Sequence, residues 1–173
     1  LITIKGNETC QDLTIGSGTS GTLDFGNGAN YTLTITGNIL VNTGGIFEYT
    51  FNSARQHTLM LTGNFNNLGT VNFVKDANDY VRTTFTGTSN SIISGGGNWT
   101  SLGYMTLNKS NRTYIVDIQD AGFSAALTSG STTLNYTSVV PIKGTLKHNN
   151  AGTLGNIYEP GMTKADPFII PTN

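Results

Sequence analysis

The sequence is poor in charge and in helix-forming residues. Only 11% of its 173 residues are charged and 36% are apolar, whereas a typical globular domain is about 25% charged. Glycine, with 22 residues, together with threonine and asparagine, takes the place of lysine and glutamate. Threonine favours strands, while glycine and asparagine favour turns that need positive φ. The composition therefore predicts an all-β protein and excludes a mainly helical one.

The features that mark several other classes of protein are also missing. The one cysteine, Cys10, has no second thiol with which to form an internal disulfide. The net charge is −1 and the basic residues are scattered, so nothing indicates binding to nucleic acid or to an anionic membrane. No apolar run approaches the ~18–20 residues of a transmembrane helix. The chain begins at Leu1 rather than at methionine, and we interpret it as a processed or internal segment of a longer polypeptide.

A seven-residue unit occurs twice. Thr32–Asn38 has the sequence TLTITGN and Thr58–Asn64 has TLMLTGN, and their glycines are 63 − 37 = 26 residues apart. Weaker copies lie upstream at Leu1–Asn7 and downstream at Thr83–Gly87. Each copy alternates apolar residues with threonine and ends at a glycine, which predicts a strand followed by a tight turn. A period in this range is typical of solenoid proteins.

We therefore predict a right-handed parallel β-helix of about seven short coils. Residues 1–157 would form the repeats, and 158–173, which hold three of the four prolines, would form a linker or an edge extension. Segments Phe51–Gln56 and Lys75–Asp79 are predicted as loops that make contacts. Asparagine or threonine ladders are expected at the corners, and caps or neighbouring modules at the two ends. The residues expected to point inward, and to stack on neighbouring coils about 4.8 Å away, are Leu33, Ile35, Leu59, Leu61, Val71 and Phe73.

Two stretches carry a resemblance to a known group of proteins. Thr34–Phe47, TITGNILVNTGGIF, is similar to a rung of the type LTVTGNLTVNSGGTF. Phe85–Gly95 followed by Leu102–Ser110 is similar to a unit F-x-G-x-x-x-Q-x-I-x-G … F-x-N-L-x-I-N-K-S, with Ser91 in place of the common Gln and Gly103 in place of the common Asn. Both patterns resemble the very large secreted surface proteins of Bacteroidetes.

The resemblance covers roughly residues 1–157 and implies a location and a role. Such proteins are exported by the type 9 secretion system through a separate C-terminal sorting domain, which this chain does not contain. They are displayed on the cell surface or released, and they include adhesins associated with gliding motility and attachment. The resemblance therefore implies a secreted or cell-surface protein whose partners are the secretion translocon and an adhesion ligand such as a surface glycan.

Four acidic residues are candidates for a calcium site. Asp76 and Asp79 lie near Arg82, and Asp117 and Asp120 repeat the same D-x-x-D spacing about forty residues later. If the two turns lay on one face, the four carboxylates could converge on a hard cation. The competing interpretation is that polar turns favour aspartate because it bonds to its own backbone.

The histidines and the cysteine give weaker indications of a functional site. His57 and His148 have no further ligand at metal spacing, so we expect ordinary exposed histidines. Cys10 has no adjacent histidine, so we do not expect a nucleophile.

Two outward-facing surfaces are further candidates for ligand binding. Outward threonines (Thr32, Thr34, Thr36, Thr58 and Thr62) could order water or bind ice, and aromatic side chains (Tyr31, Tyr49, Tyr80, Trp99, Tyr104 and Tyr114) could stack on sugars.

The sequence thus predicts a structural or adhesion module, a rigid β-helical stalk without enzymatic activity or cofactor. The alternative is a carbohydrate-binding or polysaccharide-degrading β-helix of the pectate-lyase type, which needs convergent acidic and basic groups beside an aromatic-lined groove. A third class, the antiparallel two-sheet sandwich of some adhesins, would show hairpins in place of stacked coils.

Overall fold

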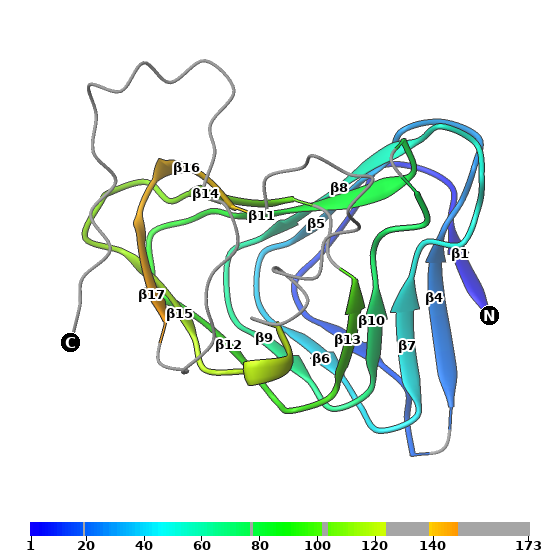
Figure 1. Cartoon of the computed structure of the whole chain (residues 1–173), viewed down its shortest axis with the longest axis horizontal. Coiled ribbons are helices and arrows are strands. Elements are labelled where there is room, and N and C mark those ends of the chain that lie inside the picture. The colour runs from blue at the N-terminus through cyan, green and yellow to red at the C-terminus, as the bar shows by residue number, and fades with distance from the viewer. Residues whose placement is uncertain (19, 77, 102–103, 124–138, 149–173) are drawn as a thin grey trace.

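The computed structural model describes residues 1–18, 20–76, 78–101, 104–123 and 139–148. Over these residues the chain is a β-solenoid that passes through three sheets in turn as it winds (Figure 1). All of its strand pairs are parallel. Within the described ranges the one antiparallel contact is an isolated bridge between Val74 and Tyr80. The predicted parallel β-helix is confirmed, and the antiparallel sandwich is excluded.

We name the three sheets A, B and C. In spatial order, sheet A contains β1 (Ile2–Ile4), β4 (Gly21–Phe25), β7 (Gly45–Glu48), β10 (Thr70–Asn72) and β13 (Asn98–Ser101). Sheet B contains β2 (Glu8–Cys10), β5 (Thr32–Ile35), β8 (Gln56–Leu61), β11 (Tyr80–Phe85), β14 (Met105–Asn108) and β16 (Val139–Lys143). Sheet C contains β3 (Leu13–Ile15), β6 (Ile39–Val41), β9 (Phe65–Asn67), β12 (Ser91–Ser94), β15 (Ile115–Ile118) and β17 (Thr145–His148).

The repeated unit stacks on its own second copy. β5 pairs with β8 so that Thr32 lies beside Thr58 and Ile35 beside Leu61. The downstream copy continues this stack, because Phe85 lies on the other side of Leu61. The period found in the sequence is therefore one coil, and the unit is the sheet B strand with the corner that follows it.

The upstream copy at Leu1–Asn7 was assigned wrongly. Its strand, β1, belongs to sheet A and pairs with β4. The strand that stacks on β5 is β2, in which Glu8 lies beside Leu33. Alternation of apolar residues and threonine is common to any strand with one buried face, so the pattern predicted a strand without identifying its sheet.

The core consists of columns of apolar side chains that run from coil to coil. All six residues predicted to point inward are buried, Leu33 at 4% exposure and the other five at 0%. Aromatic rings also contact one another between coils: the ring centroids of Phe25 and Phe47 lie 5.9 Å apart, and those of Phe47 and Phe73 lie 4.9 Å apart. The predicted stacking of the core is confirmed.

The described solenoid has fewer coils than predicted. Its sheets are five, six and six strands deep, whereas division of the whole chain length by the repeat gave about seven coils. Residues 124–138 and 149–173 lie outside the described part. The domain boundary placed at 157/158 falls among them and remains a prediction, as does the right-handed winding.

A ladder of side-chain oxygens runs along the corner between sheets B and C. The N–H of Asn38 donates to Asp12 Oδ1 (2.7 Å), and the N–H of Asn64 donates to Asn38 Oδ1 (2.9 Å). Asn64 Oδ1 in turn accepts from the N–H of Ile92 (2.9 Å). Each coil offers an oxygen to the coil that follows it in the sequence. The predicted corner ladder is therefore present, and it has a direction.

The glycine of the repeated unit is not required by a left-handed turn, because neither Gly37 nor Gly63 has a positive φ. It is required because the backbones of successive coils lie very close together at this corner. A Cβ at Gly63 would lie 2.7 Å from Asn38 Oδ1, and a Cβ at Gly37 would lie 2.7 Å from the carbonyl oxygen of Gln11. Successive corners thus pack too tightly for any side chain. This differs from the turn geometry that the composition suggested.

Candidate functional site

A polar network occupies the corner between sheets A and B, centred on Asp79. Asp79 is 1% exposed. Its Oδ1 accepts from the hydroxyl of Tyr49 (2.8 Å) and from the backbone N–H groups of Ser53 (3.0 Å) and Arg55 (2.9 Å). The Tyr49 hydroxyl also lies 2.9 Å from Ser53 Oγ. Asp79 precedes β11, while its partners follow β7 on the coil before. The network therefore joins the two segments predicted as contact loops, Phe51–Gln56 and Lys75–Asp79.

Asp76 and Asn52 extend this network towards solvent. Asp76 Oδ1 accepts from the N–H groups of Asn78 (2.7 Å) and Asp79 (3.1 Å). With its amide nitrogen turned towards the carboxylates, Asn52 donates to Asp76 Oδ2 (3.1 Å) and Asp79 Oδ2 (3.3 Å). An exposed side chain of one loop thus binds both carboxylates of the other.

Asp79 is held in its anionic form by this arrangement. Burial by itself would raise the pKa of its carboxyl group. The donors from Arg55, Ser53 and Tyr49 outweigh burial, and the pKa lies below its ordinary value of 3.8. A buried carboxylate with this many donors fixes the geometry of the loops around it.

His57 lies in the core, and the expectation that it is exposed was wrong. It is the first inward-facing residue of β8, and its exposed fraction is 0%. Its ring stacks on Phe25, with centroids 4.8 Å apart, and meets the ring of Tyr49 edge-on at 4.6 Å. Its Nδ1 accepts from the N–H of Tyr31 (3.0 Å), which places the hydrogen on Nε2. Burial lowers the pKa of His57 to about 4, so the ring is neutral at pH 7.

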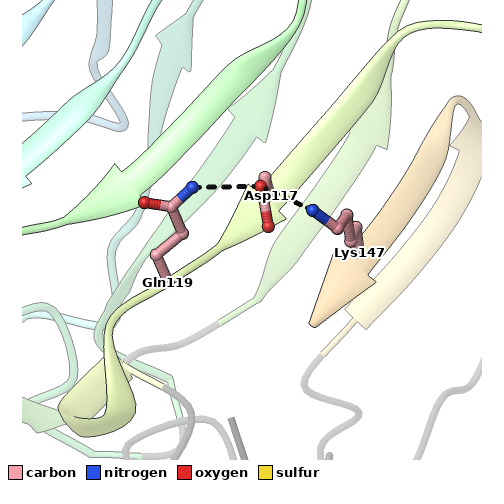
Figure 2. Close-up of polar contacts among 3 residues, drawn as sticks. All are labelled: Asp117, Gln119 and Lys147. Carbon is pink, nitrogen blue, oxygen red and sulfur yellow. Dashed lines mark hydrogen bonds and ion pairs between the residues drawn. The ribbon is translucent and has the colours of Figure 1, made fainter. Parts of the chain in front are cut away.

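Asp117 and Asp120 lie elsewhere in the fold. Figure 2 shows Asp117 of β15 between two donors: Lys147 of β17 (3.2 Å) and Gln119 Nε2 (3.1 Å). Asp120 follows β15. Its Oδ1 accepts from the N–H groups of Gly122 (2.8 Å) and Phe123 (3.1 Å), and its Oδ2 accepts from the N–H of Gly96 (2.7 Å).

The four aspartates therefore do not converge as the calcium hypothesis required. Asp76 and Asp79 stand at the corner before sheet B, while Asp117 and Asp120 stand on sheet C and directly after it. Among the described residues, no group of three or more His, Cys, Asp or Glu side chains is arranged to hold a metal ion. Asp76 and Asp120 accept from backbone N–H groups of their own turns, as the competing interpretation held. Asp79 instead binds a loop of the coil before it, and Asp117 binds side chains.

The other two candidates take no part in this network. Cys10 is a free, half-buried thiol at the end of β2. Burial raises its pKa, and the charge of Asp12 adds to the effect, so the reactive thiolate is disfavoured. His148 is the last residue of β17, and its side chain lies outside the described part.

Sequence reasoning missed Lys109, which is 1% exposed and lies just after β14. Its Nζ donates to the carbonyl oxygens of Thr86 (2.6 Å) and Thr62 (3.2 Å) and to Ser91 Oγ (2.7 Å). Thr62, Thr86 and Lys109 follow β8, β11 and β14, so one side chain ties three successive coils at the corner between sheets B and C. Burial lowers the pKa of Lys109 to about 8. The only sequence signal was its position in the N-K-S end of the matched unit.

Three of the six aromatic candidates are buried. Tyr49, Tyr80 and Trp99 have exposures of 0%, 5% and 6%. Trp99 lies between two other rings, at 5.0 Å from Phe65 and 4.8 Å from Phe123. These three residues cannot form the sugar-stacking platform that the carbohydrate alternative requires.

The outward face of sheet B carries the predicted threonines in a wider array. Threonine occupies seven outward positions on or directly after β5, β8 and β11, and the array is interrupted by Met60 and Arg82. The face is weakly charged. The register of β5 on β8 and of β8 on β11 aligns its residues in rows that run from coil to coil. The seven residues are Thr32, Thr34, Thr36, Thr58, Thr62, Thr84 and Thr86.

Comparison with known proteins adds no relative. No protein-family profile matches the chain, and neither a curated protein nor a solved structure matches it. Within the described ranges, no helix has the length and apolarity that a membrane span requires.

Replacement of Asp79 by alanine should destabilise the fold strongly. It would leave the backbone N–H groups of Ser53 and Arg55 without this acceptor and remove one partner of the Tyr49 hydroxyl, at a cost of about 3 kcal/mol in the free energy of unfolding. Asp117→Ala is the control, because it removes a partly exposed ion pair and should cost at most about 1 kcal/mol. Urea denaturation at pH 7 measures both. If the two substitutions lowered the free energy of unfolding equally, the Asp79 network would contribute no more to stability than the exposed ion pair does.

Lys109 should give the protein a distinct dependence on pH. Its pKa is lower in the folded chain, about 8, than the ordinary 10.5. Between these values the unfolded chain binds more protons, so the contribution of Lys109 to stability rises with pH. Between pH 7.5 and 9.5, the free energy of unfolding of the wild type should therefore increase by about 2 kcal/mol relative to Lys109→Met. Parallel pH profiles for the two proteins would contradict this assignment.

Proposed function

We propose that this chain is a structural module of a secreted or cell-surface bacterial protein, a rigid β-helical segment without enzymatic activity. The observation that carries the proposal is the continuity of the three parallel sheets and of the core columns through every described coil. Such a body transmits load from one coil to the next through backbone hydrogen bonds and packed side chains. Its polar residues serve the same end, because Asp79 and Lys109 each bind groups on neighbouring coils.

The module is suited to present contact surfaces on its outside. The loop of residues 50–55 and the turn before β11 are fixed against each other by Asp79 and Asn52. The threonine-rich face of sheet B offers a second, weakly charged surface. We propose that such surfaces carry adhesion to a glycan or another extracellular ligand. The resemblance to Bacteroidetes surface proteins supports export by a type 9 system and a role in attachment.

The carbohydrate-active alternative has less support. A polysaccharide lyase needs acidic and basic side chains that converge where a substrate can reach them. Among the described residues, Asp79, His57 and Lys109 are at most 1% exposed. Their hydrogen bonds and ring contacts are to the protein itself, which favours a structural role.

The mechanical role can be tested by pulling on single molecules held at the two ends of the chain. A rigid stalk should keep a constant extension as force rises. It should then lengthen in steps of about one coil, since each released residue adds about 3.3–3.6 Å. A chain that lengthens gradually from the lowest forces would contradict the proposal.

Incubation with a panel of acidic and neutral polysaccharides tests the alternative directly. We expect no release of new chain ends by the wild-type protein. Turnover that Asp76→Ala or Asp117→Ala abolishes, while both variants keep the wild-type thermal midpoint, would make the chain an enzyme and overturn the non-enzymatic proposal.

A further inference from the structure

Asn27 and Gly28 form the one Asn-Gly dipeptide of the sequence. They lie in the corner between β4 and β5, outside both strands, and both residues are exposed. Within the described ranges, no hydrogen bond involves the Asn27 carboxamide or the Gly28 N–H. Because Gly28 carries no side chain, its nitrogen is also open to approach. The Asn27 side chain and the backbone nitrogen that follows it are therefore free to meet.

Asparagines at other corners lack this freedom. Asn30, in the same corner, uses its Oδ1 to accept from the N–H of Gln56 on the next coil (3.1 Å). Five asparagines are held in this way: Asn7, Asn30, Asn38, Asn64 and Asn90. To turn towards its own backbone, such a carboxamide must first break a hydrogen bond between coils. The fold thus restrains these asparagines and leaves Asn27 unrestrained.

Arg55 of the next coil contacts the main-chain carbonyl group of Asn27. Its Nε donates to the Asn27 carbonyl oxygen (3.2 Å). The Arg55 backbone is fixed in turn, because its N–H donates to Asp79 Oδ1 (2.9 Å). A guanidinium group that donates to a carbonyl oxygen stabilises negative charge on that oxygen. The main-chain carbonyl carbon of Asn27 is therefore activated towards attack.

We propose that Asn27 is a site of spontaneous deamidation and that Arg55 directs the reaction towards isoaspartate. The Gly28 nitrogen attacks Cγ of Asn27 and loses its proton, and the side-chain nitrogen leaves as ammonia, which closes a succinimide ring. Water then opens the ring at one of its two carbonyl carbons. Attack at Cγ gives aspartate. Attack at the main-chain carbonyl carbon, which Arg55 polarises, gives isoaspartate.

Either product changes the charge of this corner. One carboxylate is gained, so the net charge falls from −1 to −2 (−1 − 1 = −2). In isoaspartate the main chain runs through the former side chain, and the freed carboxylate retains the oxygen that Arg55 contacts. The contact then becomes an ion pair between neighbouring coils. The inference predicts that the surface beside the loop of residues 50–55 gains charge as the protein ages, and it does not depend on the proposed function.

Ageing of the full chain at pH 7.5, followed by peptide mapping with mass spectrometry, tests the site. The matched control is Glu8→Gly, which creates a second Asn-Gly dipeptide at Asn7, whose Oδ1 accepts from the N–H of Thr32 (2.8 Å). In the folded variant, Asn27 should deamidate about fivefold faster than Asn7, the factor expected for one ordinary hydrogen bond. In urea the two sites should react at the same rate.

Two results would overturn the assignment of the site. One is an Asn27 amide that stays intact in the folded wild type while it is lost in urea. The other is an equal rate at Asn27 and Asn7 in the folded Glu8→Gly variant, since the fold would then make no selection between them.

Arg55→Met tests the direction of ring opening. The isoaspartate-to-aspartate ratio at residue 27, measured by enzymatic methylation of isoaspartate and by peptide mapping, should fall about threefold relative to the wild type, or about 0.7 kcal/mol between the two barriers. Arg82→Met is the control, because it removes an exposed positive charge that stacks on Tyr104 instead. It should leave the ratio unchanged, as should unfolding of either variant in urea relative to the unfolded wild type. The same ratio in folded Arg55→Met and folded wild type would overturn the role of Arg55.

Discussion

The structure depends on the register in which each coil stacks on the next. Side chains of a strand alternate between the two faces, so a slip of one residue would turn every inward side chain of that strand outward. The pairings of Leu33 with Leu59 and of Leu59 with Thr83 keep the inward series aligned over three coils. The tight corner at Gly63 supports the same register, because a side chain there would collide with the coil before it. Core, corners and outer faces all follow from this one alignment.

Buried polar groups reinforce the stack at its corners. A corner interrupts the strand ladder, so its backbone groups need other partners. Asp79 supplies acceptors to a loop of the coil before it, and Lys109 supplies donors to carbonyl groups of two earlier coils. These charged side chains look like catalytic candidates when judged by residue type and shifted pKa alone. Their near-complete burial and their hydrogen bonds to the protein itself show that they stabilise the stack, which supports the proposed structural module.

The sequence predicted what repeats and missed what depends on contacts between distant coils. The 26-residue offset of Thr-Leu-x-aliphatic-Thr-Gly-Asn was enough to obtain the solenoid, the inward positions and the corner ladder. It was not enough to place Leu1–Asn7, since every half-buried strand alternates in the same way. The burial of His57 arises from Phe25, Tyr31 and Tyr49 on other strands and loops. The partners of Lys109 lie 18–47 residues away in sequence, and no local pattern marks them.

Disulfide trapping across adjacent coils tests the register most directly. Thr34 and Met60 face each other on β5 and β8, and parallel neighbours about 4.8 Å apart fall within the range that a disulfide can bridge. In a Cys10→Ser background, cysteines at 34 and 60 should cross-link rapidly under mild oxidation with the fold intact. Cysteines at 34 and 61 should not, because residue 61 points into the core. Preferential cross-linking of 34 with 61 would show that the strands pair in another register and would contradict the whole account.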